Sequence, residues 1–221
     1  MVKNKNKIFF NDKATIDSLK KSLIKNNISI TPTDTVFGLI ANITFKSYKK
    51  LNNIKTKRDN KPYLILIDSI QKLKKFVSNK NLSNKNIINL INNCWPGPVT
   101  IIFKAKKNLP KYLKSEQNTI AIRCPNNKNL QKLLSSFDGL FSTSANISNQ
   151  PIPTIIENID PEILKKIDYL VVDIKKSLPQ TLPSTIIDLS NEKEIKVLRK
   201  GAFPIGKLEE YYGTKFKKSG E

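Results

Sequence analysis

The chain has 221 residues, contains no histidine, and carries 39 Lys and Arg against 18 Asp and Glu, a formal net charge of +21 at pH 7. Without histidine, Ser–His–Asp triads, Cys–His dyads, His-ligated metals and imidazole acid–base catalysis are excluded. Two cysteines, Cys94 and Cys124, make neither a disulfide framework nor a zinc site.

The positive charge has two explanations. It is either a basic surface for polyanions such as RNA, or the result of a composition rich in Lys, Asn and Ile throughout the chain. Apolar residues occur in short runs, far below the ~20 that a membrane span needs. The polar first seven residues lack a signal-peptide core. We therefore expect a cytoplasmic protein that does not enter a membrane.

Helical periodicity predicts helices, in chain order, at residues 11–27, 47–55, 69–77, 83–92, 129–136, 161–167 and 205–212. Apolar and β-branched runs predict strands at residues 28–31, 63–67, 99–103, 119–123, 140–143, 169–172, 184–188 and 195–198. Some neighbouring strands lack a helix between them. We therefore expect a single α/β domain with a twisted, mixed parallel and antiparallel sheet and flanking helices. The expected domain covers residues 8–212, and the expected disordered basic tail covers residues 213–221.

Polar residues follow the first predicted strand in residues 29–41, SITPTDTVFGLIA. The hydroxyl groups of Thr33 and Thr35 either hold a small polar substrate or cap a following helix. Residues 55–62, KTKRDNKP, place four cations within seven residues after a predicted helix. Such a run is either a phosphate clamp or a solvated surface. In CWPGPVT, prolines and a glycine enforce a tight turn, which we expect Trp95 to anchor in the core.

Later segments also place polar groups at strand ends, where α/β proteins commonly bind ligands. Arg123 ends the apolar strand of TIAIRCP, and a ligand carboxylate or phosphate would satisfy its guanidinium bidentately. FSTSANIS, residues 141–148, supplies hydroxyl and amide groups that hydrogen-bond phosphate, ribose or backbone. Ser184 and Thr185 precede one predicted strand, and Arg199 follows another. From the residues alone these segments indicate an anion-binding cleft of unspecified purpose, since the sequence has neither a Walker pattern nor GxGxxG.

Taken together and in order, the segments resemble one family. The motifs PTDTVFGL, K-x-(K/R)…KP, WPGPVT, AIRCP, STSANIS, PSTIIDL and LRKG follow the successive motifs of the YrdC/TsaC family of threonylcarbamoyl-AMP synthases. The resemblance spans roughly residues 28–202. It implies the family's single α/β domain with a concave, positively charged cleft, in the short form without a second domain.

The resemblance also implies a role for individual residues. The positions that match the L-threonine site are Thr33, Arg123 and Ser184. The positions that match the ATP site are Lys55, Lys57, Arg58, Thr119, Ser144, Asn146 and Arg199. The family's Lys-x-Arg motif binds the phosphates, which assigns catalysis to Lys55, Lys57 and Arg58. Lys57 stands where arginine is usual and Arg58 follows it, so either residue fills that role.

The implied reaction converts L-threonine, bicarbonate and ATP into threonylcarbamoyl-AMP and pyrophosphate, for the modification of adenosine 37 of tRNA. The enzyme would be a nucleotidyltransferase that acts by positioning and charge stabilisation. Its Mg²⁺ would be held mainly by the nucleotide phosphates, with no protein metal ligand expected. The family context implies a TsaD-type tRNA threonylcarbamoyltransferase as the downstream partner.

Two other functions stay open at this point. The first is a relative of the same fold that binds RNA or tRNA through the basic cleft and makes no adenylate. The second is a carbamoyl-transfer module like the related domain of hydrogenase-maturation proteins. Those modules normally belong to much longer chains with zinc-finger-like cysteines.

Overall fold

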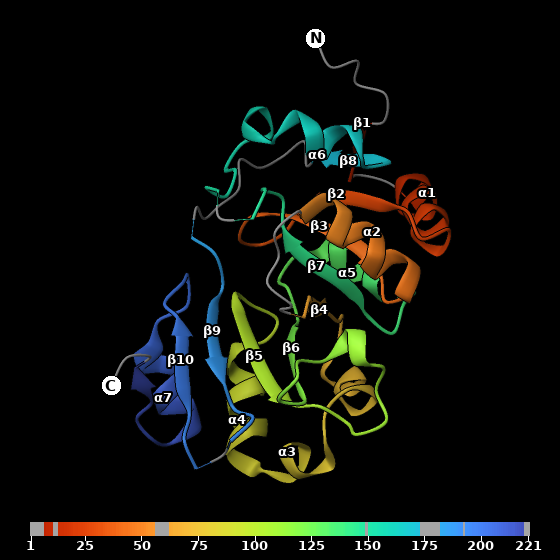
Figure 1. The fold of residues 1–221 in the computed structure, drawn as a ribbon. Helices are drawn as coiled ribbons and strands as arrows, with labels where there is room; N and C mark the ends of the chain where they lie inside the picture. The colour runs from red at the N-terminus through yellow and green to blue at the C-terminus, as the bar shows by residue number, and fades with distance from the viewer. Residues whose placement is uncertain are drawn as a thin grey trace.

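The computed structural model describes residues 7–10, 13–55, 62–148, 150–172, 182–191 and 193–218. The strands of these residues are β1 (Lys7–Phe9), β2 (Ile28–Pro32), β3 (Phe37–Asn42), β4 (Leu64–Leu66), β5 (Val99–Lys104), β6 (Thr119–Arg123), β7 (Leu140–Ser144), β8 (Tyr169–Val172), β9 (Thr185–Asp188), β10 (Lys196–Arg199) and β11 (Lys217–Lys218). They form one sheet in the order β1-β8-β2-β3-β7-β4-β6-β5-β9-β10-β11 (Figure 1). Parallel and antiparallel neighbours both occur, for example β5 with β9 and β5 with β6, so the predicted mixed sheet is confirmed.

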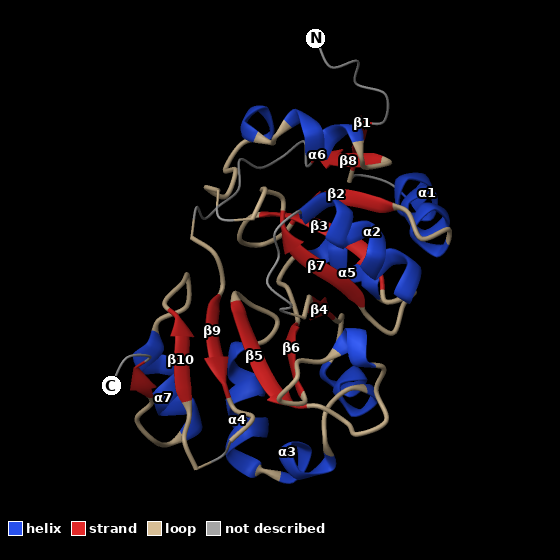
Figure 2. Ribbon diagram, in the orientation of Figure 1, coloured by secondary structure: helices blue, strands red, loops and turns tan. Residues whose placement is uncertain are grey.

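Helices flank this sheet (Figure 2). The α-helices are α1 (Lys13–Ile24), α2 (Phe45–Lys55), α3 (Asn79–Ser83), α4 (Lys85–Cys94), α5 (Lys128–Leu134), α6 (Pro161–Lys165) and α7 (Ile205–Tyr212). The 3₁₀-helices are η1 (Ile70–Lys75), η2 (Lys111–Leu113) and η3 (Ile156–Asn158). The predicted helix at residues 69–77 is therefore η1, a tighter and shorter element than expected.

The two faces of the sheet carry separate hydrophobic clusters because side chains alternate along a strand. In β3, Leu39 and Ala41 join the larger cluster, which also contains residues of α2, α4 and α7. Ile40, between them, joins the smaller cluster under α1 and α5. Trp95 is 5% exposed within the larger cluster, as predicted for the anchor of its turn.

The strand β3 was not predicted. The turn of residues 33–36 leads into this strand, which pairs with β2 and β7. Of the two alternatives for Thr33, the cap of a following helix is therefore not realised, because a strand follows the turn. Gly38 lies inside β3 opposite Ser144, and a Cβ added to it would come within 3.1 Å of Ser142 Oγ. Glycine here allows a close approach of β7. The structure also adds β1, α3 and β11 to the predicted elements.

The prediction of a disordered tail at residues 213–221 does not hold for residues 213–218, which the structure describes. Gly213 has a φ of 88° and ends α7 in the left-handed conformation. Phe216 is then buried, its backbone N–H donating to Glu209 Oε1 at 3.0 Å, and Lys217–Lys218 pairs with β10. A single aromatic residue in a Lys-rich segment thus attaches it to the domain.

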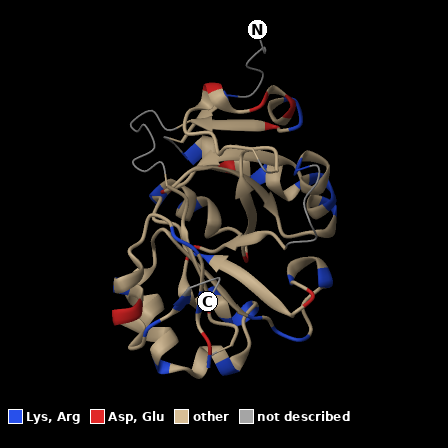
Figure 3. Cartoon of the chain, turned by 60° about the vertical axis from the view of Figure 1, so that its left-hand side comes forward, with Lys and Arg blue, Asp and Glu red and all other residues tan. Residues whose placement is uncertain are grey.

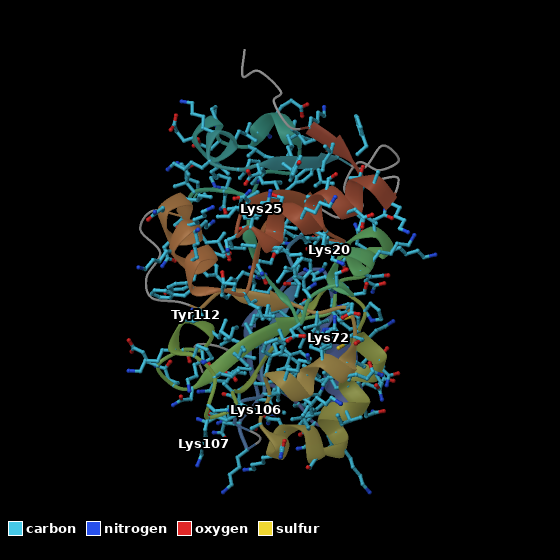
Figure 4. The ribbon with its side chains drawn as sticks, turned by 90° about the vertical axis from the view of Figure 1, so that its right-hand side faces the viewer. Lys20, Lys25, Lys72, Lys106, Lys107 and Tyr112 are labelled. Carbon is cyan, nitrogen blue, oxygen red and sulfur yellow. The ribbon has the colours of Figure 1, made fainter. Side chains whose placement is uncertain are left out.

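Lysine and arginine are distributed over the whole molecule. Figure 3 shows them on helices and loops of both the upper and the lower part of the chain. In Figure 4, Lys20 and Lys25 lie at α1, whereas Lys106 and Lys107 lie toward the other end of the molecule. Basic residues therefore occur at both ends of the molecule. In the described part of the chain, no helix is long and apolar enough to cross a membrane.

The segment that follows β10 lies directly on the segment that precedes β9. A Cβ at Gly201 would stand 2.3 Å from the carbonyl oxygen of Pro183 and 2.4 Å from the carbonyl carbon of Ser184. Because both obstacles are backbone, we expect Gly201→Ala to lower the free energy of unfolding by at least ~2 kcal/mol. The melting temperature should fall by about 4–8 °C, measured by circular dichroism.

Gly206→Ala is the matched control, because a Cβ at Gly206 in α7 would meet nothing within 4 Å. Alanine is the better helix former, so this variant should be at least as stable as the unmodified chain. Equal melting temperatures for the two variants would contradict the close backbone contact.

Candidate functional site

A cavity of about 650 Å³ opens on one face of the sheet. Ile120 and Ile122 of β6 point into the core, whereas the alternate residues Thr119, Ala121 and Arg123 line the cavity. The same alternation brings polar residues of β5, β7 and β9 to this face. In Figure 1, β7 lies in the upper part of the molecule and β5, β6 and β9 lie in the lower part, so the cavity joins the two.

Most of the predicted site residues meet at this cavity. Its lining includes Thr33, Thr119, Arg123, Ser144, Ser184 and Arg199. Lys55 and Asn146 do not line it but contact one another and Ser144, which does. Lys57 and Arg58 lie outside the described residues, so their placement stays a prediction.

Arg123 is the most thoroughly buried cation of the cavity, with a side chain 5% exposed. Its Nε donates to the carbonyl oxygen of Gly97 at 3.0 Å, and its Nη1 donates to Thr35 Oγ1 at 2.9 Å. Its Nη2 pairs with Asp34 Oδ1 at 2.5 Å. The sequence prediction left this guanidinium to a ligand, but the protein itself provides the first carboxylate. Of the five N–H donors of an arginine, two remain for a ligand.

Asp34 is a site residue that the sequence analysis did not assign, and Thr35, whose hydroxyl it considered for a substrate, is not among its matched site positions. Asp34 is 10% exposed at its side chain, and its buried Oδ2 has no hydrogen-bond partner among the described residues. Both residues follow Thr33 in the motif PTDT, which carries two hydroxyls and a carboxylate in three residues after a strand. That density of polar groups was a usable signal, but the pairing with Arg123 spans 89 residues and needs the fold.

Thr33 shapes the turn between β2 and β3. Its Oγ1 accepts from the backbone N–H groups of Thr35 and Val36 at 3.1 and 3.2 Å, and it donates to the carbonyl oxygen of Val36 at 2.7 Å. Thr33 is only 6% exposed, yet it lines the cavity. The hydroxyl is thus a turn-stabilising group whose methyl and oxygen are held at a fixed place in the wall.

A second guanidinium, that of Arg199, stands near the first. Its Nε donates to the carbonyl oxygen of Ser184 at 2.9 Å, and its Nη2 donates to Ser184 Oγ at 3.0 Å. Ser184 Oγ also lies 2.8 Å from Thr100 Oγ1, a further residue that the sequence analysis did not assign. Burial, and then the positive charge of Arg123, lower the pKa of Arg199. An anion bound beside the two guanidiniums would relieve their repulsion.

Lys55 ends α2 and is 3% exposed, so it is not part of a solvated surface. Its Nζ donates to the carbonyl oxygen of Ser144 at 3.0 Å and to Asn146 Oδ1 at 3.0 Å, and it also contacts the Asn146 carbonyl oxygen. The Lys55 carbonyl oxygen accepts from Ser148 Oγ at 2.7 Å. In this arrangement Lys55 holds the loop after β7, and through Ser144 it shapes the wall of the cavity.

Thr119 belongs to a hydroxyl pair at another part of the wall. Its Oγ1 lies 2.7 Å from Ser115 Oγ, and its backbone N–H donates to that oxygen at 3.1 Å. Both residues line the cavity. Ser115 was not predicted, because nothing in its lysine-rich surroundings marks it as a site residue.

The two cysteines do not supply a nucleophile. Burial raises the pKa of the Cys94 and Cys124 thiols from 9.0 to about 12. Both side chains are 2% exposed. Since the thiolate is the reactive form, these thiols are inert at neutral pH.

The charged pair of Asp34 and Arg123 should dominate local stability. We expect Asp34→Ala to lower the free energy of unfolding by about 3–5 kcal/mol, because it leaves a buried guanidinium short of its carboxylate. Asp138→Ala is the control, because the Asp138 side chain, which pairs with Lys75, is 58% exposed. This substitution should lower the free energy of unfolding by less than ~1 kcal/mol. Urea denaturation measures both values. Similar losses for the two variants would show that the Arg123 pair is not buried as described.

The thiols should resist modification in the folded protein. We expect a thiol reagent at pH 8 to react with Cys94 and Cys124 only after unfolding in denaturant. A thiol that holds its proton to about pH 12 when folded, but to about 9.0 when unfolded, contributes stability below pH 9. That contribution should be lost as the pH rises from 9 to 12. Rapid modification of either thiol in the native protein would refute its burial.

Comparison with known proteins agrees with this geometry. Residues 21–201 match the Sua5, YciO and YrdC family, whose description is "Telomere recombination". A relative from Methanocaldococcus jannaschii, named "Putative threonylcarbamoyl-AMP synthase", is 38% identical over 197 residues, 89% of this chain and 90% of that protein. A threonylcarbamoyl-AMP synthase from Pseudoalteromonas translucida is 29% identical over 184 residues, 82% of this chain and 97% of that protein.

Solved structures share the fold. Sua5 of Pyrococcus abyssi in complex with L-threonine superposes with a TM-score of 0.83 at 25% identity, over 96% of this chain and 61% of that chain. The chain thus spans about three-fifths of the solved Sua5. Escherichia coli YciO superposes with a TM-score of 0.78 at 22% identity, over 90% of this chain and 96% of that chain. The mixed sheet, the cavity-lining motifs and these matches together place the chain in the Sua5, YciO and YrdC family.

Proposed function

We propose that this protein is a threonylcarbamoyl-AMP synthase, which makes threonylcarbamoyl-AMP and pyrophosphate from L-threonine, bicarbonate and ATP. The observation that carries the proposal is the pair of guanidiniums of buried Arg123 and half-buried Arg199, in a cavity lined by many hydroxyl groups. ATP and bicarbonate are anions, and L-threonine carries a carboxylate, so two guanidiniums in a partly enclosed cavity favour the binding of all three. The family and its synthase members support the same activity.

L-Threonine is proposed to bind at Thr33, Arg123 and Ser184. The two N–H donors that remain on Arg123 match a carboxylate, which accepts a planar guanidinium bidentately. Thr33 and Ser184 lie in the same wall and are rigid, because both are buried and hydrogen-bonded. Their hydroxyl groups suit an amino acid that itself carries a hydroxyl. The complex of Pyrococcus abyssi Sua5 with L-threonine supports this substrate.

The proposed reaction needs little acid–base catalysis by protein side chains. Bicarbonate takes up one proton and loses water to give carbon dioxide. The uncharged amine of threonine adds to this carbon dioxide and loses one proton, which gives an N-carboxylate. An oxygen of this carboxylate attacks the α-phosphorus of ATP, the bond from that phosphorus to the bridging oxygen breaks, and pyrophosphate leaves. The nucleophile is ionised at neutral pH, so a chain without histidine can position both reactants and stabilise charge.

ATP is proposed to contact Thr119, Ser144 and Arg199 in the wall. Asn146 and Lys55 complete this part of the proposal by holding the loop that carries Ser144. Lys57 and Arg58 would add charge at the triphosphate. Their segment follows Lys55 directly in sequence, and Lys55 itself contacts the carbonyl oxygen of Ser144.

Mg²⁺ is proposed to arrive with ATP and to be held mainly by its phosphates. Among the described residues that line the cavity, Asp188 is the one carboxylate, so the wall offers no cage of acidic ligands. Mg²⁺ commonly binds with phosphates and few protein groups, and such an ion would neutralise charge on the leaving pyrophosphate.

The product is proposed to serve a TsaD-type tRNA threonylcarbamoyltransferase in the cytoplasm. Direct contact with tRNA is the second candidate, favoured by the formal net charge of +21. Lysines spread over both parts of the molecule offer a polyanion many weak contacts rather than one built groove. Steep salt dependence of RNA binding, without threonine-dependent use of ATP, would favour an RNA-binding protein instead.

The proposed activity is tested by pyrophosphate release from ATP and Mg²⁺. We expect release to require both L-threonine and bicarbonate, because the nucleophile forms from the two together. Omission of either should reduce the rate to background. Release that continues without L-threonine would indicate a different nucleotide hydrolysis and refute the synthase.

Lys55→Ala should reduce the rate of pyrophosphate release by about 10²-fold or more, since it frees the loop of Ser144 and Asn146 and removes a buried charge. Lys46→Ala, on the exposed side of the same helix, is the control and should keep its activity. Thermal melting of both variants separates lost catalysis from lost folding. Near-normal release by a folded Lys55→Ala variant would contradict the role proposed for Lys55.

A further inference from the structure

The strand register gives the cavity two chemically different ends. On β9 and the residue before it, Ser184, Ile186 and Asp188 share the face that lines the cavity. Ser184 lies at the two guanidiniums, whereas Asp188 stands four residues later, roughly 13 Å away along an extended chain. One end of the cavity is therefore cationic, and the other carries a carboxylate.

Arg199 does not neutralise that carboxylate. It pairs with Ile186 in the sheet, midway between Ser184 and Asp188. Its guanidinium turns toward Ser184, with bonds of 2.9 and 3.0 Å to the carbonyl and hydroxyl oxygens. The side chain thus points away from Asp188, which leaves the acidic end separate from the cationic end.

Asp188 itself keeps acceptor capacity for a ligand. Its Oδ1 accepts from the backbone N–H of Ser190 at 2.8 Å, a bond that orients the side chain. No described residue donates a hydrogen bond to its Oδ2. An ionised carboxylate only accepts hydrogen bonds, so a ligand group that binds this half-buried side chain would be a donor.

The wall between the two ends is apolar. Ile102 pairs with Asp188 on one side and with Ala121 on the other, and Ile186 lies beside them on the same face. This row suits the flat, weakly polar part of a nucleoside, whereas the cationic end suits its phosphates. A nucleoside triphosphate with phosphates at Arg123 and Arg199 would bring its sugar or base to Asp188.

We propose that Asp188 is the residue that selects ribonucleotides, by accepting hydrogen bonds from the vicinal 2′- and 3′-hydroxyl groups of the ribose. This inference rests on the proposed use of ATP. Two hydroxyl donors match the two oxygens of one carboxylate. The adenine amino group is a poorer match, because each edge of the base places an acceptor beside that donor, a pattern that suits an amide side chain.

The test compares ATP with 2′-deoxyATP, 3′-deoxyATP and inosine triphosphate, by calorimetric binding and by pyrophosphate release. We expect the unmodified protein to bind ATP about 10-fold or more tightly than either deoxynucleotide, as for hydrogen bonds to a charged group. Asp188→Asn should weaken the binding of ATP about 10-fold and leave the binding of the deoxynucleotides nearly unchanged, so that the preference for ATP disappears. The amide oxygen can still accept from Ser190, so the local turn is kept.

Asp138→Asn, an exchange at an exposed carboxylate outside the cavity, should retain the full preference. Asp188→Glu keeps the charge but moves it, and should show an intermediate preference if the asparagine variant does not fold. A ribose preference that survives in Asp188→Asn overturns the inference. So does a preference for ATP over inosine triphosphate that Asp188→Asn abolishes, which would assign Asp188 to the base.

The dependence of pyrophosphate release on Mg²⁺ concentration distinguishes a metal-ligand role of Asp188 from a role in binding ribose. An increased Mg²⁺ requirement of Asp188→Asn, with the ribose preference intact, would overturn the inference in favour of a metal contact. Failure of the proposed synthase activity would give a different result from failure of the proposed role of Asp188. In that case the unmodified protein would bind ATP with the ribose preference but release no pyrophosphate in response to L-threonine, and the inference on Asp188 would stand.

Discussion

The buried guanidinium of Arg123 is the constraint on which the site depends. A charge with a side chain only 5% exposed is tolerated because Asp34, Thr35 and the Gly97 carbonyl oxygen hold it from three directions. These partners come from the turn after β2 and the turn before β5, so the one side chain joins both parts of the molecule. The cost of desolvating the cation is offset before any ligand arrives, and the remaining donors are already oriented.

The sheet converts this local arrangement into a cavity. Alternation along β5, β6 and β9 sends one set of apolar side chains to the core and leaves hydroxyl, charged and a few apolar side chains on the opposite face. Glycine at positions 38 and 201 allows backbone segments to approach closely at the edges of this face. The result is a rigid wall with separate cationic, apolar and acidic regions, a form that can hold two anionic reactants in one orientation.

Strand and helix positions were predictable wherever one periodicity dominated. The strand at Thr119–Arg123 and the helix at Ile205–Tyr212 have the predicted bounds. The strand β3 was missed because Pro32 and Gly38 are residue types that commonly end a strand. Gly38 instead lies inside β3, where the absence of a side chain allows β7 to pack closely. Ordered motifs identified six residues of the cavity wall, but not Asp34 as the partner of Arg123. That pairing joins residues 89 positions apart, which no local pattern reports.

The central claim is that Arg123 is a preorganised receptor for the carboxylate of L-threonine. Calorimetric titration with L-threonine and with L-threoninol, which has an alcohol in place of the carboxylate, tests it most directly. The account predicts that L-threoninol binds at least about 10-fold more weakly, because it cannot accept the two remaining guanidinium hydrogen bonds as a charged group. Equal affinity for the two compounds would show that Arg123 serves the fold alone and would contradict the account.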